Sequence, residues 1–167
     1  NAGLVIAVAD DPSMHSSQNE QDSRNYAKAA KIPMVEPSDS RECKEFIKYA
    51  YELSEKYDTP MLFRLSTRVA HSQSIVELEE RDEVEVKDYE PDIAKYVMMP
   101  GNAIKKHPIV EKRIADMTEY AETTPLNRIE YGDKKIGVIT SGMCYNYVKE
   151  AFGDGVSVLK LGMTYPL

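Results

Sequence analysis

The most unusual segment of the sequence is Asp10–Arg24 (DDPSMHSSQNEQDSR), which gathers side chains that give and accept hydrogen bonds. Within ten positions it carries His15, Ser16, Ser17, Gln18, Asn19, Glu20, Gln21, Asp22 and Arg24. A loop of this composition either solvates a turn or lines a polar site, and both interpretations stay open. A serine nucleophile activated by histidine is disfavoured, because no G-x-S-x-G elbow is present.

Further candidates for binding an anion stand later in the chain. Arg68 and His71 lie in the string TRVAHS, directly after an apolar run, where capping a strand end or contacting another domain is the alternative. Arg64 stands inside that run and is expected to pair within the fold or to extend its charged end to solvent. Thr140-Ser141-Gly142 precedes a helical pattern, so an anion at the helix start is conceivable, but a tight turn explains it better.

The polar loop follows a predicted strand, which indicates its place in the fold. Gly3–Ala9 (GLVIAVA) is continuously apolar, the pattern of a strand buried on both faces of a parallel sheet. Two more apolar runs, Pro33–Glu36 and Met61–Leu65, alternate with helical patterns, the first of them at Ser23–Ala30. This alternation predicts an α/β fold with a mainly parallel sheet, in which ligands bind beyond the carboxyl ends of the strands.

The strongest helical pattern begins at Asp39. This residue stands three positions before Glu42, the spacing of a capping box. Apolar side chains then recur at helical spacing on one face, at Cys43, Phe46, Ile47, Ala50, Leu53 and Tyr57.

From Ser72 onward the character of the chain changes. Residues 72–95 carry nine acidic and three basic residues and form a charged connector, in which Val84–Val86 could add an edge strand. A helix is predicted to open at His107-Pro108, and a strand–helix–strand pattern starts at Lys135. The sequence therefore predicts three parts: 1–71, a first α/β unit; 72–133, an interdomain connector; and 134–167, the opening of a second α/β unit.

Composition excludes several classes of protein. The net charge of −7 makes nucleic acid an unlikely partner, and no apolar run is long enough for a membrane span. Two distant cysteines, Cys43 and Cys144, offer neither a metal-ligand spacing nor a disulfide framework, so free thiols in the cytoplasm are expected. Strand-like patterns stand close to both ends, so we expect an internal piece of a longer chain.

Three strings together resemble a known family. VADDPSMHSSQNEQDSRNYAKAAKIPMVEPSDS, YELSEKYDTPMLFRLSTRVAHS and KIGVITSGMCYNYVKEAFGDGVSVLKLGMTYPL are similar to the large subunit of indolepyruvate:ferredoxin oxidoreductases, within the wider 2-oxoacid:ferredoxin oxidoreductase family. The resemblance implies the later half of a pyrimidine-type thiamine-diphosphate domain, followed by the start of a domain like the transketolase carboxy-terminal domain. The acidic connector matches in place more than in residues.

The resemblance also implies an activity. Enzymes of this family decarboxylate a 2-oxoacid on thiamine diphosphate with magnesium, pass electrons through 4Fe–4S clusters to ferredoxin, and release an acyl-CoA. A small beta subunit is the implied partner, and a homo-oligomer is left open. The ligands of the diphosphate, metal and clusters match nothing here, so this segment is expected to bind none of them and to be inactive alone.

Site residues are carried over from the same resemblance. Arg24 falls where pyruvate-specific relatives carry an arginine near the substrate carboxylate, and a surface ion pair with Asp22 is the alternative. His15 is the second catalytic candidate, and a hydrogen bond within its own loop is the alternative. Arg68 and His71 fall where relatives show an arginine and a histidine. The remaining loop residues expected to face the substrate or cofactor are Ser16, Ser17, Gln18, Asn19 and Gln21. Two alternatives remain: a related oxidoreductase with another 2-oxoacid, and a non-catalytic α/β interaction module.

Overall fold

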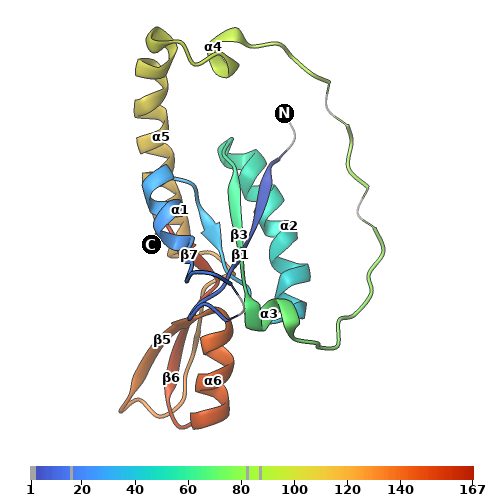
Figure 1. The fold of residues 1–167 in the computed structure, drawn as a ribbon, viewed down its shortest axis with the longest axis vertical. Helices are drawn as coiled ribbons and strands as arrows, with labels where there is room; N and C mark the ends of the chain where they lie inside the picture. The colour runs from blue at the N-terminus through green and yellow to red at the C-terminus, as the bar shows by residue number, and fades with distance from the viewer. Residues whose placement is uncertain (1–2, 16, 82, 87) are drawn as a thin grey trace.

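The protein folds as two mixed β-sheets with helices packed against them (Figure 1). The computed structural model describes residues 3–15, 17–81, 83–86 and 88–167. In chain order the elements are β1 (Val5–Asp10), α1 (Arg24–Ala30), β2 (Met34–Val35), α2 (Ser40–Tyr57), β3 (Met61–Ser66), α3 (Thr67–His71), α4 (Ile93–Tyr96), α5 (Pro100–Ala121), β4 (Arg128–Glu130), β5 (Gly137–Ser141), α6 (Gly142–Phe152), β6 (Ser157–Leu161) and β7 (Met163–Tyr165).

The first sheet has the strand order β1-β3-β2-β7. The pairings β1–β3 and β3–β2 are parallel, which confirms the predicted α/β fold with parallel strands. β7 was not predicted and pairs antiparallel with β2, so the end of the chain joins the first sheet. β1 was expected to be buried on both faces; this is wrong, because the strand lies at the sheet edge with Ile6 37% exposed.

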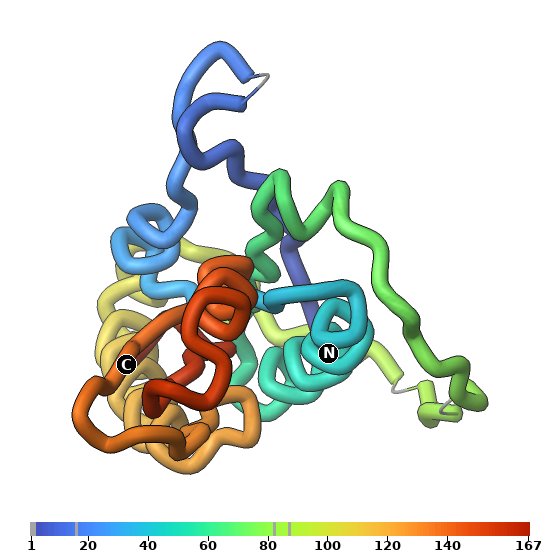
Figure 2. The backbone as a smooth tube through the Cα atoms, turned by 90° about the horizontal axis from the view of Figure 1, so that it is seen from below, coloured from blue at the N-terminus to red at the C-terminus, as the bar shows by residue number. Residues whose placement is uncertain are grey.

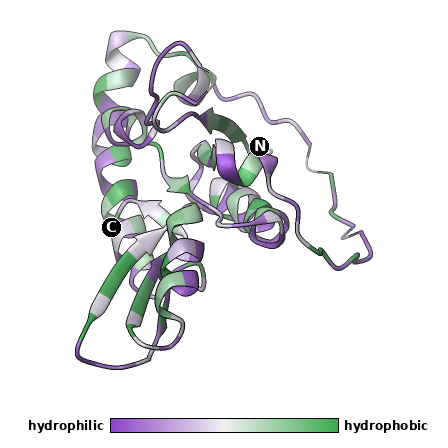
Figure 3. Cartoon of the chain, turned by 60° about the horizontal axis from the view of Figure 1, so that its bottom comes forward, coloured by the Kyte–Doolittle hydropathy of each residue, from purple (hydrophilic) through white to green (hydrophobic). Residues whose placement is uncertain are grey.

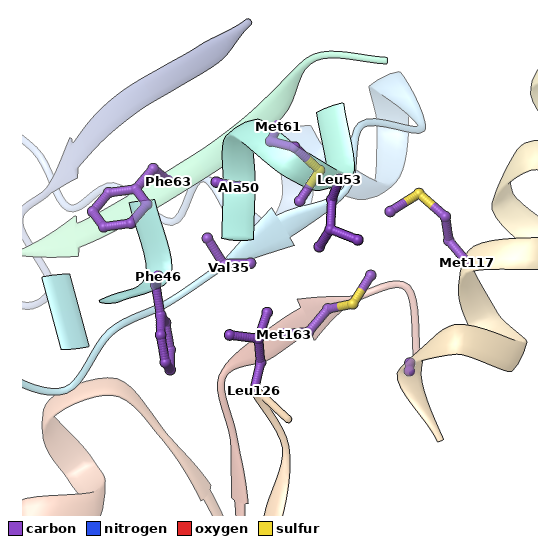
Figure 4. Close-up of a cluster of buried hydrophobic side chains, with 10 residues drawn as sticks. Val35, Phe46, Ala50, Leu53, Met61, Phe63, Met117, Leu126 and Met163 are labelled. Carbon is purple, nitrogen blue, oxygen red and sulfur yellow. The ribbon is translucent and has the colours of Figure 1, made fainter. Parts of the chain in front are cut away.

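Helices cover both faces of this sheet. α1 packs Ala27 on one face against Met34 and Leu62. On the other face, α2 and the end of α5 close a larger core in which sulfur-containing side chains fill the space between strands and helices (Figure 4). Its buried members are Val35, Phe46, Ala50, Leu53, Met61, Phe63, Met117, Ala121, Leu126 and Met163.

The second sheet has the order β4-β6-β5, with β5–β6 parallel and β4–β6 antiparallel. The predicted strand–helix–strand pattern is present as β5, α6 and β6. β4 lies within the stretch predicted to be a connector; three residues carry too little pattern to be recognised without their partner strand. The strands of this sheet are rich in hydrophobic residues (Figure 3). The division of the chain into three parts stays a prediction.

The acidic stretch after α3 swings away from the two sheets before it returns at α4 (Figure 1). The edge strand expected at Val84–Val86 is not formed in the described residues 83–86. α5 begins at Pro100, seven residues before the predicted start, because this proline occupies the first helical turn, where no backbone donor is needed. Pro108 therefore lies inside the helix. None of the helices in the described ranges has the length and apolar character needed to cross a bilayer.

A buried ion pair joins the second sheet to α2. The Asp39 side chain accepts a hydrogen bond from the Glu42 backbone N–H at 2.8 Å, as the capping spacing predicts. The Glu42 carboxylate turns elsewhere, to the Nζ of the fully buried Lys160 on β6 and, at 2.9 Å, to the Nη1 of Arg128 on β4. Side chains from two strands of the second sheet, β6 and β4, thus donate hydrogen bonds to one carboxylate on α2.

The stability that the Glu42 carboxylate contributes depends on pH. Burial disfavours its charge, but the hydrogen bond and charge of Lys160, together with hydrogen bonds from Ser38 and Arg128, hold the pKa of Glu42 below its ordinary value of 4.5. Burial also lowers the pKa of Lys160, although Glu42 opposes this shift. Glu42 therefore contributes stability that is present above pH 4.5 and is lost as the pH falls through its lower folded-state pKa.

We predict that Glu42→Gln lowers the free energy of unfolding by about 3–5 kcal/mol at pH 7, because it leaves Lys160 buried without its counter-charge. The difference from wild type should shrink as the pH falls below 4.5, the ordinary pKa of this carboxyl. Urea unfolding of the chain at several pH values measures both effects. Glu45→Gln, on the exposed side of α2, is the control and should change little. If the free energies of unfolding of wild type and Glu42→Gln differed by the same amount at every pH, the pH dependence would not come from Glu42.

Candidate functional site

A cleft of about 580 Å³ opens where the loop after β1 and the end of β3 meet the start of α6. The first wall consists of Pro12, Ser13, His15, Arg24, Arg64, Ser66 and Arg68. Glu36 lies at the base between the walls, and the second wall consists of Ile139, Thr140, Ser141, Met143, Cys144 and Tyr147. A further groove lies along α2 beside the connector, but its Lys44 and Lys48 already pair with Glu79, so the cleft is the better candidate.

Strand register explains why charged groups meet at the base of the cleft. Side chains alternate across a strand, so Arg64 points to the same face as Leu62, which packs under α1. Asp10 ends β1 opposite Ser66, and Glu36 directly follows β2 beside the strand that carries Arg64. The three groups therefore point to one face at the carboxyl edge of the sheet, where ligands of α/β sheets bind.

Arg64 links the two acids. Its side chain is 4% exposed; Nε donates to Asp10 Oδ2 at 2.5 Å, and Nη1 donates to Glu36 Oε1. Asp10 also accepts hydrogen bonds from the backbone N–H and the hydroxyl of Ser23, at 2.8 and 2.5 Å. Because Asp10 precedes the polar loop and Ser23 follows it, one carboxylate holds both ends of the loop.

The polar loop projects from the body of the protein (Figure 2). Its first part is conformationally strained: Ser13, Met14 and His15 have φ angles of 60°, 65° and 41°. The His15 backbone N–H donates to the Ser13 carbonyl at 2.8 Å across a tight three-residue turn. Three successive side-chain-bearing residues with positive φ are costly, and such strain is concentrated at functional sites.

Arg24 begins α1 and is oriented by a neighbour. Its Nε and Nη2 donate to the two carboxylate oxygens of Asp22, both at 2.8 Å. These hydrogen bonds raise the pKa of Arg24 above its ordinary value and lower the pKa of Asp22. The guanidinium is thus held in one direction, and the edge formed by Nη1 and Nη2 still has donors for a second carboxylate.

The start of α6 is already occupied by an acid. Ser141 Oγ lies 3.4 Å from Glu36 Oε2, and an ideal Cβ on Gly142 would lie 2.4 Å from Glu36 Oε1. Gly142 also has a φ of +51°, so both space and backbone conformation require glycine. β5 ends at Ser141 and α6 begins at Gly142, so the tight connection that the sequence favoured over an anion site is present, with Glu36 beside it.

The structure brings three of the predicted site residues into the cleft: His15, Arg24 and Arg68. Arg68 is exposed at the start of α3 and has no ion-pair partner among the described residues. The other predicted residues do not line the cleft: Ser17, Gln18, Asn19 and Gln21 lie along the projecting loop, and His71 ends α3. Ser16 lies outside the described residues.

Sequence reasoning named Thr140 and Ser141 but missed Glu36, Ser66 and the apolar side chains of the second wall. The Ser66 hydroxyl is buried and has no hydrogen-bond partner among the residues that the structure describes. Only the position of Glu36 at a predicted strand end could have indicated its role. The second wall depends on where α6 packs, which no local pattern reveals.

The described residues do not fit an iron–sulfur cluster or a magnesium diphosphate site. No group of three or more His, Cys, Asp or Glu side chains in the described ranges is arranged to hold a metal ion. Burial raises the pKa of Cys43 to about 11, so this thiol stays protonated, and Cys144 is exposed on another helix.

Curated relatives match the chain over nearly all its length. It is 44% identical to the indolepyruvate oxidoreductase subunit IorA of Methanothermobacter marburgensis and 44% identical to that of Thermococcus kodakarensis, each over 99% of this chain. The IorA of Archaeoglobus fulgidus is 41% identical over 99% of it. The chain is homologous to a segment of IorA subunits. It spans only 27–28% of the length of these relatives.

A solved structure has a similar fold. A solved 2-oxoglutarate:ferredoxin oxidoreductase from Magnetococcus marinus, with 2-oxoglutarate, coenzyme A and succinyl-CoA bound, superposes with a TM-score of 0.52. The match covers 92% of this chain and 33% of the other, at 14% identity, and so shows a shared fold alone. No protein-family model matches the chain.

We predict that Gly142→Ala lowers the free energy of unfolding by about 1–4 kcal/mol, because the new methyl group meets buried Glu36 and the backbone keeps a positive φ. Thermal and urea unfolding measure the change. Gly137→Ala, in the neighbouring strand with no atom within 4 Å of an added Cβ, is the matched control and should be nearly neutral. Equal stability of both variants would show that Glu36 does not pack against α6 as described.

Proposed function

We propose that the chain is part of an oxidoreductase that oxidatively decarboxylates aryl 2-oxoacids, such as indolepyruvate, to acyl-CoA with ferredoxin as electron acceptor. The observation that carries this proposal is the 41–44% identity to IorA subunits over 99% or more of the chain. The cleft supports it, because arginines gather at the carboxyl edge of an α/β sheet.

In this proposal Arg24 receives the substrate carboxylate. A guanidinium makes two parallel charge-assisted hydrogen bonds to a carboxylate and so fixes both position and orientation. Asp22 occupies one edge of the Arg24 guanidinium and leaves another edge able to donate. Orientation of the acid before reaction lowers the entropic cost of reaching the transition state.

Arg68 and His15 complete the polar wall. Arg68 supplies a positive charge that no described acid neutralises, whereas Arg64 is committed to Asp10 and Glu36. His15 stands exposed on the strained turn and is a candidate proton donor or hydrogen-bond donor to the substrate. The loop residues beyond it, Ser17 to Gln21, are proposed to face substrate or cofactor in the assembled enzyme.

The remaining chemistry belongs to other parts of that enzyme. Thiamine diphosphate would supply the carbanion-stabilising centre, with magnesium and 4Fe–4S clusters bound outside these 167 residues. A small beta subunit, CoA and ferredoxin are the proposed partners, and the cytoplasm is the proposed compartment. The isolated chain is accordingly proposed to be inactive.

We predict that Arg24→Ala lowers kcat/KM for indolepyruvate by roughly ten- to a hundredfold in the full-length, anaerobically assembled enzyme, the usual loss for one hydrogen bond to a charged group. KM should rise more than kcat falls, because the contact acts mainly in binding. Arg24→Lys keeps the charge without the fork and should recover part of the loss.

The matched control is Arg41→Ala, which removes an exposed arginine that pairs with Glu45 on α2 and does not line the cleft. It should leave the kinetics unchanged. Wild-type kcat/KM in a folded, cofactor-loaded Arg24→Ala enzyme would show that Arg24 is only a surface residue of α1.

A further inference from the structure

The wall of the cleft opposite the arginines is partly apolar, because large apolar side chains stand there beside Thr140, Ser141 and Cys144. Ile139 comes from β5, and Met143 and Tyr147 come from α6. Met143 and Tyr147 stand four residues apart, so they lie one above the other on one face of the helix. A continuous strip of sulfur, aromatic ring and branched alkyl group therefore faces the guanidinium groups.

Two of these side chains, Ile139 and Tyr147, are not needed for the core. Ile139 is 71% exposed and Tyr147 is 50% exposed, and neither belongs to the buried clusters. Tyr145, two residues earlier, behaves differently: its hydroxyl donates to Glu130 at 2.8 Å, and the Arg128 guanidinium lies over its ring. Tyr145 thus serves the packing of α6, whereas Tyr147 is left on the cleft.

One carboxylate, that of Glu36, contacts both walls. Glu36 accepts from Arg64, which fixes the polar loop through Asp10, and the same carboxylate lies against Gly142 at the start of α6. Moving the apolar wall away from the polar wall would uncover a buried ion pair. The cleft is therefore preorganised for a ligand with one anionic end and one apolar end.

We propose that Ile139, Met143 and Tyr147 determine substrate specificity by receiving the aromatic ring of an aryl 2-oxoacid whose carboxylate is held across the cleft by Arg24 and Arg68. This inference rests on the proposed function and adds the residues that distinguish aryl from small 2-oxoacids. The cleft volume of about 580 Å³ is ample for a bicyclic ring with a three-carbon acid. Thioether and tyrosine ring are good partners for a planar aromatic group.

The test uses the full-length enzyme assembled with its partner subunit under anaerobic conditions. Tyr147→Ala and Met143→Ala should each lower kcat/KM for indolepyruvate and phenylpyruvate by on the order of tenfold, mainly through KM. Turnover of pyruvate, which has no ring, should stay within about twofold of wild type. Tyr147→Phe keeps the ring and should keep the preference.

A binding measurement makes the result independent of turnover. Indole-3-acetate, an aryl carboxylate without a reactive ketone, should inhibit the wild-type enzyme competitively, with an inhibition constant that rises on the order of tenfold in both alanine variants. Ile129→Ala, on an exposed strand position outside the cleft, is the control and should change neither quantity.

The outcomes separate the two proposals. A wild-type enzyme that oxidises no 2-oxoacid would overturn the proposed function. An active wild-type enzyme whose Tyr147→Ala and Met143→Ala variants keep both the aryl-to-pyruvate ratio and the inhibition constant would overturn the specificity assignment alone. Since both side chains lie on the cleft surface, cofactor loading of the variants should match wild type.

Discussion

The cleft depends on the ion pairs that the buried Arg64 guanidinium makes with two carboxylates. The guanidinium bridges Asp10 and Glu36, and through them it holds the polar loop on one side and the start of α6 on the other. The ion pair of Lys160 with Glu42 holds β6 of the second sheet against α2. Buried charges contribute little net stability when paired but are costly to separate, so they specify how the two sheets pack.

Local patterns predicted the elements that carry their own signature. α2 follows from the apolar spacing and from Asp39 at its start, which accepts the hydrogen bond that the spacing requires. β4 and β7 were not predicted, because three-residue strands are stabilised by pairing with distant segments, β6 and β2. The edge position of β1 also depends on strand order, since an apolar run looks alike in the centre and at the edge of a sheet.

Some residues of the candidate site could be predicted from local sequence, and others could not. Arg24 and His15 could be named from the sequence because they lie in one polar loop after one strand. Glu36 and Tyr147 could not, because their roles exist only once α6 packs against the carboxyl edge of the first sheet. The tight connection at Ser141-Gly142 was also favoured from the sequence, but the Glu36 carboxylate that lies beside it was not foreseen. The polar residues of the cleft could therefore be predicted from one local segment of sequence. The shape of the cleft and its apolar side chains depend on tertiary packing.

The most direct measurement is an experimental structure of the full-length, assembled enzyme with indole-3-acetate bound. The account predicts the carboxylate within hydrogen-bond distance of Arg24 or Arg68 and the indole ring against Met143 and Tyr147, with Glu36 still bonded to Arg64. A ligand bound elsewhere, in an enzyme whose cleft is filled by another part of the protein, would contradict it.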